Sequence, residues 1–359
     1  MSQPPSQPER FELEKEPAFR GKRLLLFTLL FVLLTFLGVY AIYSQIAGHA
    51  LAWDSRLLDP RFLVASLLLL LVYFTADGLR LWFVLRALGE QIPLSAIGRL
   101  VFLNIFVSNI TPLATGGGVA QVWFMRRRGV AVGTALSATT IRTVLAVLFI
   151  FSATPVLLML LPGAQQAITS DALIRALAVS LLIYVGFFVV LLTRPGWLLR
   201  PVLVFLALLH RLRLLGDQRH RRWRHRLVRE SRRFARGFGR YLRGAWLDIA
   251  ASLLFTAVFL LALFSFPALL LWTLGYGIDY WMIIGRMIMT TFVMYFSPTP
   301  GASGIAEGVF GQFFRDIVDP SHLVLVTLAW RALTIYLGML IGLFVSQHEL
   351  VRARRHPLP

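Results

Sequence analysis

Charged side chains are few inside the apolar stretches of this sequence, and each of them needs an explanation. A charge at the centre of a lipid bilayer costs about 2.5–3.5 kcal/mol on insertion scales. Two acids, Asp77 and Glu307, lie well inside apolar runs, and three arginines accompany them: Arg80, Arg142 and Arg331. Carboxylates and guanidinium groups at this depth predict either internal ion pairs or contact with a polar ligand.

The arginines allow more than one interpretation. Asp77 and Arg80 are three residues apart, on one face of a helix, and we expect an ion pair between them near its cytoplasmic end. Arg142 lies about 10 Å into a later apolar run, and Arg331 lies at a similar depth in the last one. Either arginine could snorkel to the headgroup region. Alternatively, both face a shared cavity and bind phosphate through the planar guanidinium fork.

The second acid lies in a segment that breaks its apolar run, YFSPTPGASGIAEGVF (residues 295–310). Glu307 is in the first turn after Gly304, where the N-terminus of a helix favours a carboxylate. Two interpretations stay open: a structural cap, or a functional group that carries a proton, pairs with Arg331 or binds a cationic headgroup. The turn formers complete this candidate site: Pro298, Pro300, Gly301 and Gly304.

A similar break occurs earlier, in NITPLATGGGVAQVWF (residues 109–124). Placed over the later segment without a gap, at an offset of 186 residues, it aligns Pro112 with Pro298 and Gln121 with Glu307. Its glycine amides, at the opening of a helix, could cradle an anion, although glycine runs are also common at plain turns. The candidate residues of this copy are Pro112, Gly116, Gly117, Gly118 and Gln121.

The elements that hold these residues are expected to be membrane helices. Hydrophobic residues make up 57% of the 359 residues, charged residues only 15%, and the mean hydropathy is +0.72. Soluble domains average roughly 25% charged residues. Six apolar runs have about the twenty residues needed to cross about 30 Å of hydrocarbon. They are residues 24–46, 62–85, 135–161, 172–193, 245–274 and 323–346. The fold class is therefore all-α, a polytopic transmembrane helical protein.

The two broken segments do not fit as crossings. Residues 100–124 have basic residues at both ends, and residues 281–318 must then enter and leave from the other side. Unsatisfied backbone groups are not tolerated in lipid, so both breaks should lie inside the protein. Each broken segment stands between two long spans, which predicts two re-entrant helical hairpins in an inverted-topology repeat. Such paired interruptions indicate a binding site at the membrane midplane.

This pattern predicts a single integral membrane domain at residues 24–346. Its first repeat spans about residues 62–161 and its second about residues 245–346. Residues 1–23 are polar and rich in proline and charge, which predicts a disordered cytoplasmic tail. Residues 347–359 are predicted to form a second cytoplasmic tail, so that both termini lie inside the cell.

A basic loop, residues 194–244, joins the repeats. Residues 194–243 carry fifteen arginines and two acids, within a net charge of +19. Positive loops stay on the cytoplasmic side, and basic residues near a membrane are attracted to anionic headgroups by about 1 kcal/mol each. No nucleic-acid recognition motif accompanies the charge. We therefore expect a multi-pass protein of the plasma or inner membrane that contacts lipids with anionic phosphate headgroups and no nucleic acid. The sequence leaves open whether it forms homo-oligomers.

Motifs for catalysis are missing from the sequence. It holds no P-loop, HExxH, GxSxG or Asp-x-Asp motif, and its seven histidines are scattered. It has no cysteine, and therefore no disulfide, thiol nucleophile or thiolate metal site. We expect no enzyme activity, no bound metal and no other cofactor.

The two breaks and their surroundings resemble a known family, the lysylphosphatidylglycerol synthase transmembrane-region family, over roughly residues 20–350. The segments that carry the resemblance are PTPGASGIAEGVF (298–310), LAWRALTIYLGMLIG (328–342) and NITPLATGGG (109–118) running into RRRG (126–129). The resemblance implies a flippase-like membrane domain, similar to the membrane half of multiple peptide resistance factor. That protein adds a soluble aminoacyl-transferase domain. None precedes Pro359 here, so we expect no aminoacyl-lipid synthesis.

Three functions remain open at this point. The leading hypothesis is a flippase that moves a phospholipid or polyprenyl-linked lipid across the cytoplasmic membrane, along a polar midplane path between the two broken hairpins. The alternative is a non-transporting scaffold or accessory subunit of a lipid-modifying or glycosyltransferase system. A membrane enzyme that acts on a polyprenyl-phosphate substrate is the third.

Overall fold

The computed structural model describes residues 54–160 and 217–355, with a few isolated residues between 29 and 40 and between 179 and 204. The spans predicted at 24–46 and 172–193, and the N-terminal tail, lie outside these continuous ranges. Every regular element in the described part is a helix, as the sequence predicts.

Four helices in the described part are long and apolar enough to cross a membrane. They are α2 (Pro60–Ala87), α5 (Val132–Leu160), α10 (Trp246–Thr273) and the continuous helix formed by α13 (Pro320–Arg331), η4 (Ala332–Tyr336) and α14 (Leu337–Arg355). All four begin within three residues of the predicted spans. The long apolar runs of the sequence are therefore a reliable guide to these helices.

Local sequence sets the ends of α2. Asp59 precedes the helix and its carboxylate accepts the backbone N–H of Arg61 at 2.7 Å, while Pro60 fits the first helical position, where no N–H partner is needed. At the other end Gly89 takes the left-handed conformation, φ +80°, that commonly stops a helix. The span is thus bounded by residues that favour its start and its end.

Each broken segment folds as two short helices on either side of a 3₁₀ turn. The first consists of α3 (Leu94–Asn109), η2 (Pro112–Ala114) and α4 (Thr115–Arg126), and the second of α11 (Tyr280–Met294), η3 (Pro300–Ala302) and α12 (Ile305–Phe314). Each turn contains two successive left-handed residues: Leu113 and Ala114, then Gly301 and Ala302. The helices are therefore interrupted where the Pro and Gly clusters predict.

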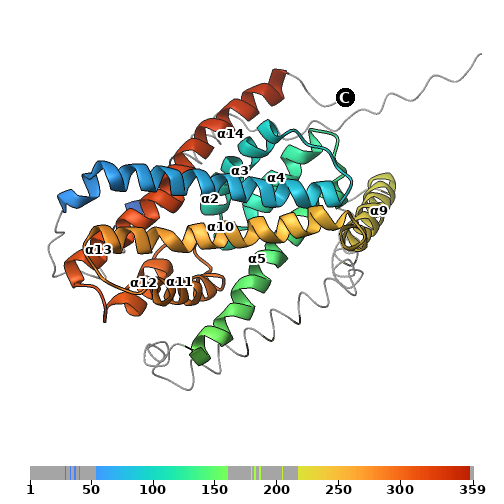
Figure 1. Ribbon diagram of the computed structural model, residues 1–359. Helices are drawn as coiled ribbons and strands as arrows, with labels where there is room; N and C mark the ends of the chain where they lie inside the picture. Colours follow the sequence, from blue (N-terminus) through green and yellow to red (C-terminus); the bar gives the residue numbers. More distant parts are fainter. Residues whose placement is uncertain are drawn as a thin grey trace, which may run out of the picture.

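The same order of elements occurs twice, and the two copies run in opposite directions. Their first helices, α2 and α10, lie side by side (Figure 1). The end of α2 meets the start of α10, where Arg86 pairs with Asp248 at 3.3 Å. The end of α10 meets the start of α2, where Arg56 donates to the carbonyl of Leu274 at 2.6 Å. The repeats are therefore antiparallel within the molecule.

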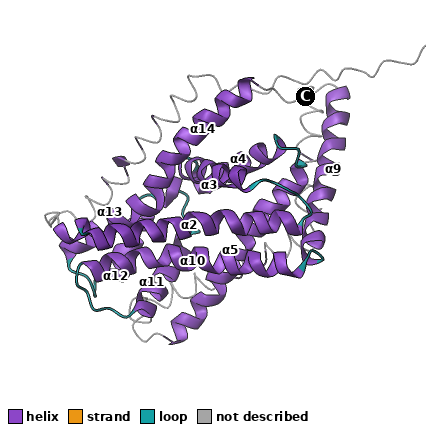
Figure 2. Ribbon diagram, turned by 45° about the horizontal axis from the view of Figure 1, so that its top comes forward, coloured by secondary structure: helices purple, strands orange, loops and turns teal. Residues whose placement is uncertain are grey.

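The contacts between the two repeats are also symmetric. The first short helix of each repeat packs against the last long helix of the other: α3 against α14, and α11 against α5 (Figure 2). The two turns, η2 and η3, contact each other between these pairs. The breaks are therefore brought together by the packing of four helices around them.

The gapless alignment of the two copies is wrong beyond the turns. The first two helices of the repeats begin 186 residues apart, but the turns and the following long helices begin 188 residues apart. Gln121 is the seventh residue of α4, whereas Glu307 is the third residue of α12. These two residues therefore do not occupy equivalent positions. The physical reason is that the second broken segment is two residues longer before its turn, and Ser303 and Gly304 lengthen it by two more before α12 starts.

The contact between α14 and α3 depends on a residue without a side chain. A Cβ atom at Gly342 would lie 2.2 Å from the carbonyl oxygen of Phe102 and 2.7 Å from the Cβ atom of Phe106. We expect Gly342→Ala to lower the free energy of unfolding by about 1–3 kcal/mol, because the neighbouring backbone cannot yield. The measurement is the unfolding temperature in detergent.

A matched control is available on α3 itself. A Cβ atom at Gly98 would have no other atom within 4 Å, so Gly98→Ala should leave the unfolding temperature unchanged or raise it. Equal effects of the two alanine substitutions would contradict the close packing of α14 on α3.

Candidate functional site

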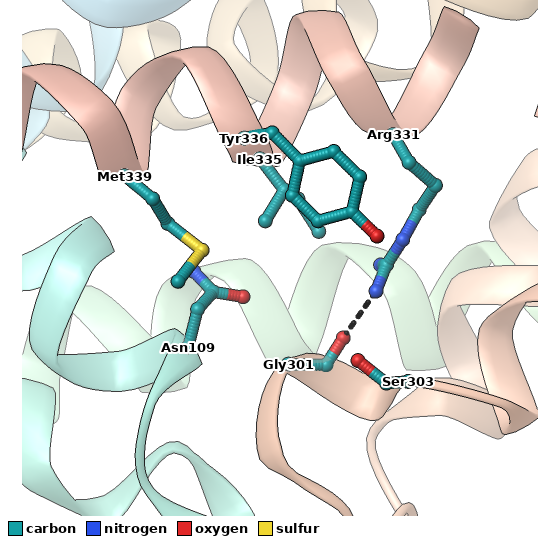
Figure 3. Close-up of a pocket in the computed structure, with 7 residues that line it drawn as sticks. All are labelled: Asn109, Gly301, Ser303, Arg331, Ile335, Tyr336 and Met339. Carbon is teal, nitrogen blue, oxygen red and sulfur yellow. Dashed lines mark hydrogen bonds between the residues drawn. The ribbon is translucent and has the colours of Figure 1, made fainter. Parts of the chain in front are cut away.

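The second break is held by an ion pair between α12 and α13. Nε of Arg331 lies 2.8 Å from Oε1 of Glu307, and each side chain is only 1% exposed. Nη2 of Arg331 donates to the carbonyl of Gly301 at 2.8 Å (Figure 3), and Oε2 of Glu307 accepts the N–H of Gly304 at 2.6 Å. The pair therefore satisfies one backbone group within the turn and one at the start of the helix that follows it. Glu307 is at once a cap of α12 and the partner of Arg331.

A small pocket adjoins this ion pair. Its volume of about 10 Å³ is room for roughly one water molecule. Arg331 and Tyr336 border it from the last long helix, Gly301 and Ser303 from the second break, and Asn109 from the first (Figure 3). The two breaks and the last helix therefore border the same small space.

The helix beside the pocket is irregular. Immediately after Arg331 it continues as a π-helix over Ala332–Tyr336, an irregularity that is frequent at functional sites. Sequence reasoning missed this feature, together with the pocket residues Asn109, Ser303 and Tyr336. The run that forms the π-helix, ALTIY, looks like any other apolar stretch, and no signal in it reveals the change of winding.

Uncharged side chains satisfy the first break. The hydroxyl of Thr111 accepts the N–H of Gly116 at 3.0 Å and donates to the carbonyl of Val107 at 2.8 Å. The side-chain amide of Asn109 donates to the carbonyl of Ile105 at 2.8 Å. These two side chains therefore bond backbone groups at the first break without an ion pair.

The glycines of the first break permit close packing. A Cβ atom at Gly117 would lie 1.8 Å from the hydroxyl of Ser108, and one at Gly116 would lie 2.5 Å from the side chain of Thr111. Gly118 has open space on the side where a Cβ atom would stand. The Gly116 amide already donates to Thr111, so not all three glycine amides are free to bind the predicted anion.

The remaining predicted residues take different places. Pro112 and Pro300 begin the turns η2 and η3, and Pro298 is exposed just before η3. The side chain of Gln121 is buried on α4, and within the described part of the chain its Nε2 makes no hydrogen bond. None of these four residues borders the pocket beside Arg331.

A second buried cluster ties α2, α5 and α10 together. Oδ1 of Asp77 accepts hydrogen bonds from Nε of Arg80 at 2.8 Å and from Nη2 of Arg142 at 2.5 Å. The Arg80 guanidinium also lies 3.7 Å from the centre of the Phe259 ring on α10, a cation–π contact. The expected Asp77 and Arg80 contact is thus present. Arg142 joins this cluster and does not reach the pocket beside Arg331.

Within the described part of the chain, this cluster holds two positive charges and one negative charge. Two buried guanidinium groups share the single carboxylate of Asp77. Nη1 of Arg80 and Nε of Arg142 make no hydrogen bond to any described residue. Buried charges are costly unless they are paired and hydrogen-bonded. The cluster therefore has the charge and the free donors to bind an anion.

Further arginine pairs hold the ends of the broken segments, and sequence reasoning missed their partners. Arg99 on α3 and Arg128 after α4 both approach Oε1 of Glu349, at 3.1 and 3.6 Å. Arg286 on α11 donates Nη2 to Asp316 at 2.9 Å. The hydrogen bonds from Arg286 hold the pKa of the Asp316 carboxyl below its ordinary value. Ion pairs thus connect residues near the ends of both broken segments.

The ligand chemistry of the site is that of guanidinium, hydroxyl and backbone groups. Among the described residues, no three His, Asp or Glu side chains lie together in a way that could hold a metal ion. A phosphate group matches this set, because arginine can offer it two parallel N–H donors.

Comparison with known proteins agrees with this architecture. The family described as lysylphosphatidylglycerol synthase TM region matches residues 22–342 of the chain. The chain belongs to this family. It is also similar to a UPF0104 membrane protein of Archaeoglobus fulgidus, with 24% identity over 324 residues that cover 90% of this chain and 97% of the relative. The resemblance noted in the sequence is therefore confirmed, and the protein is a multi-pass membrane protein of the lysylphosphatidylglycerol synthase TM region family.

The ion pair of the second break gives a first prediction for the site. Glu307→Gln or Arg331→Met alone should lower the free energy of unfolding by about 3–5 kcal/mol, because each leaves a buried charge without its partner. The double variant removes both charges and should recover much of this loss. Thermal unfolding of the four proteins in one detergent gives the coupling between the residues. Losses that simply add in the double variant would contradict the pairing.

Proposed function

We propose that the protein translocates a lipid, passing its phosphate headgroup through the helix bundle while the acyl chains stay in the bilayer. The observation that carries the proposal is the surplus positive charge at Asp77, Arg80 and Arg142, buried between helices long enough to span a membrane. A lipid phosphate supplies the missing negative charge and accepts the free donors of both arginines. The proposed activity makes and breaks no covalent bond.

The two breaks support the same function. Interrupted helices at corresponding positions of inverted repeats surround the substrate in many transporters. α5, which carries Arg142, packs against α11, the first helix of the second broken segment. Its Phe151 ring lies 6.2 Å from the ring of Tyr295, the residue after α11. The helix that carries Arg142 therefore adjoins the second break. Since the pocket beside Arg331 has room for one water molecule, we infer that the breaks separate when a headgroup passes.

The proposal includes a membrane topology. The chain crosses the cytoplasmic membrane six times, with two re-entrant hairpins, one open to each side, and with both termini inside the cell. Basic residues gather at the end of the bundle where α2 ends and α10 begins, including Arg86, Arg240 and Arg243. This end is assigned to the cytoplasm because positive residues stay on that side.

Single cysteines test the topology cleanly, because the chain has none of its own. Gly239 and Gly277 are exposed near opposite ends of the bundle, and an added Cβ atom at either would meet no other atom within 4 Å. In intact cells a membrane-impermeant maleimide should label Gly277→Cys, and should label Gly239→Cys only after the cells are opened. Labelling of both cysteines in intact cells would contradict the assignment.

Lipid movement itself can be tested with a variant that spares the fold. Arg142→Gln removes the surplus charge but leaves Asp77 paired with Arg80, so the protein should remain folded. In liposomes with headgroup-labelled phospholipid, we expect this variant to move lipid about tenfold more slowly than the unchanged protein, or slower, because a hydrogen bond to a charged group is lost. Dithionite quenching of the label gives the rate.

Two further variants complete the comparison. Arg61→Gln changes an exposed arginine at the start of α2 and should leave the rate unchanged. Asp77→Asn leaves two buried arginines without a carboxylate and should destabilise the protein more than Arg142→Gln does. If Arg142→Gln moves lipid as fast as the unchanged protein, the assignment of the phosphate site is wrong. If the unchanged protein moves no lipid under any gradient, a scaffold role gains support.

A further inference from the structure

A stripe of exposed arginines runs along α9 (Asp217–Leu242), outside the site described above. The spacing of three or four residues places its members on one face of the helix, which continues into the residue after its end. The exposed members are Arg229, Arg232, Arg236, Arg240 and Arg243. Glu230 is the single acid between residues 225 and 243. Its position decides whether the stripe is neutralised within the helix.

Glu230 is turned largely toward the bundle. Its Oε2 accepts the N–H of Gly133, in the first turn of α5, at 2.8 Å. This N–H is one of those that a helix start leaves without a partner inside the helix. Arg233 and Arg229 approach Oε1 of the same carboxylate, at 3.0 and 3.6 Å. Glu230 therefore does not neutralise the greater part of the stripe.

Close contacts fix α9 to the bundle. The hydroxyl of Ser137 on α5 donates to the carbonyl of Phe234 at 3.1 Å, and a Cβ atom at Gly237 would lie 2.1 Å from the same hydroxyl oxygen. Arg240 reaches the carbonyl of Leu88, just after α2, at 3.3 Å. The helix is thus held against the ends of α2 and α5 with its arginine face outward.

The chain holds α9 close to the start of the apolar helix α10. Three residues separate its end from the start of the apolar helix α10, a reach of about 10 Å. Leu242 and Trp246 in this connection are 74% and 73% exposed, and exposed tryptophan is typical of the zone between hydrocarbon and water. Figure 2 shows α9 running across the ends of α2 and α10 and not alongside them.

We infer that the arginine stripe of α9 binds anionic lipid headgroups of the adjacent leaflet, with the helix lying in the membrane plane. A basic helix with apolar residues at its edge is the type that settles at an anionic interface. The inference rests on the proposed topology and not on transport.

A fluorescent label on Gly239→Cys, between Arg236 and Arg240, reports the lipids beside the stripe. The full chain is placed in nanodiscs of phosphatidylcholine and phosphatidylglycerol, with a spin-labelled quencher on one lipid or the other. We expect phosphatidylglycerol to quench more strongly than phosphatidylcholine. The ratio of quenching by phosphatidylglycerol to quenching by phosphatidylcholine should fall as salt is added. It should also fall by about fivefold in Arg232→Gln and by about fivefold again in Arg232→Gln/Arg236→Gln.

The control label is Gly277→Cys at the opposite end of the bundle. The glutamine variants of α9 should leave the quenching at this label unchanged. Arg232→Lys/Arg236→Lys keeps the charge and should keep the preference. Equal quenching by both lipids at Gly239, or a preference unaffected by the glutamine variants, overturns the inference. Equal quenching together with salt-sensitive capture of a nucleic acid or an acidic protein would assign the stripe to that partner instead. Because no step depends on lipid crossing, failure here is distinct from failure of the transport assay.

Discussion

Backbone groups that a broken helix leaves free need hydrogen-bond partners when they are buried, and the rest of this structure follows from how the protein satisfies them. At the second break, Arg331 takes the free carbonyl of Gly301 and Glu307 takes the free N–H of Gly304. Neither charged side chain could remain buried without the other. The ion pair and the break therefore require each other, and the long helix that carries Arg331 is held against the turn.

The first break meets the same constraint differently, and the difference gives the molecule its asymmetry. Thr111 and Asn109 satisfy that break without charge. Arg142, the arginine of the first repeat, is consequently not needed there and joins Asp77, which already binds Arg80. The second repeat thus encloses an ion pair with no net charge, and the first encloses a cluster of described residues with one net positive charge. The two halves of the repeat are therefore unlike in their buried charges.

Sequence patterns predicted the features that depend on local composition. Long apolar runs located α2, α5, α10 and the last helix, and the Pro and Gly clusters located both turns. Features that depend on tertiary contact were missed or misassigned. Asp77 and Arg142 are 65 residues apart, so no spacing rule pairs them. Gln121 was matched to Glu307 because a gapless alignment cannot register the longer second break. The π-helix after Arg331 leaves no trace in its apolar sequence.

A structure of the protein in lipid nanodiscs tests the central claim most directly, because it shows whether a lipid phosphate completes the buried cluster. The account predicts density for a phosphate group within about 2.7–3.2 Å of Nη1 of Arg80 or Nε of Arg142. The acyl chains of that lipid should extend outward between the helices. Lipids confined to the perimeter, with both arginines bonded to water or to the protein alone, would contradict it.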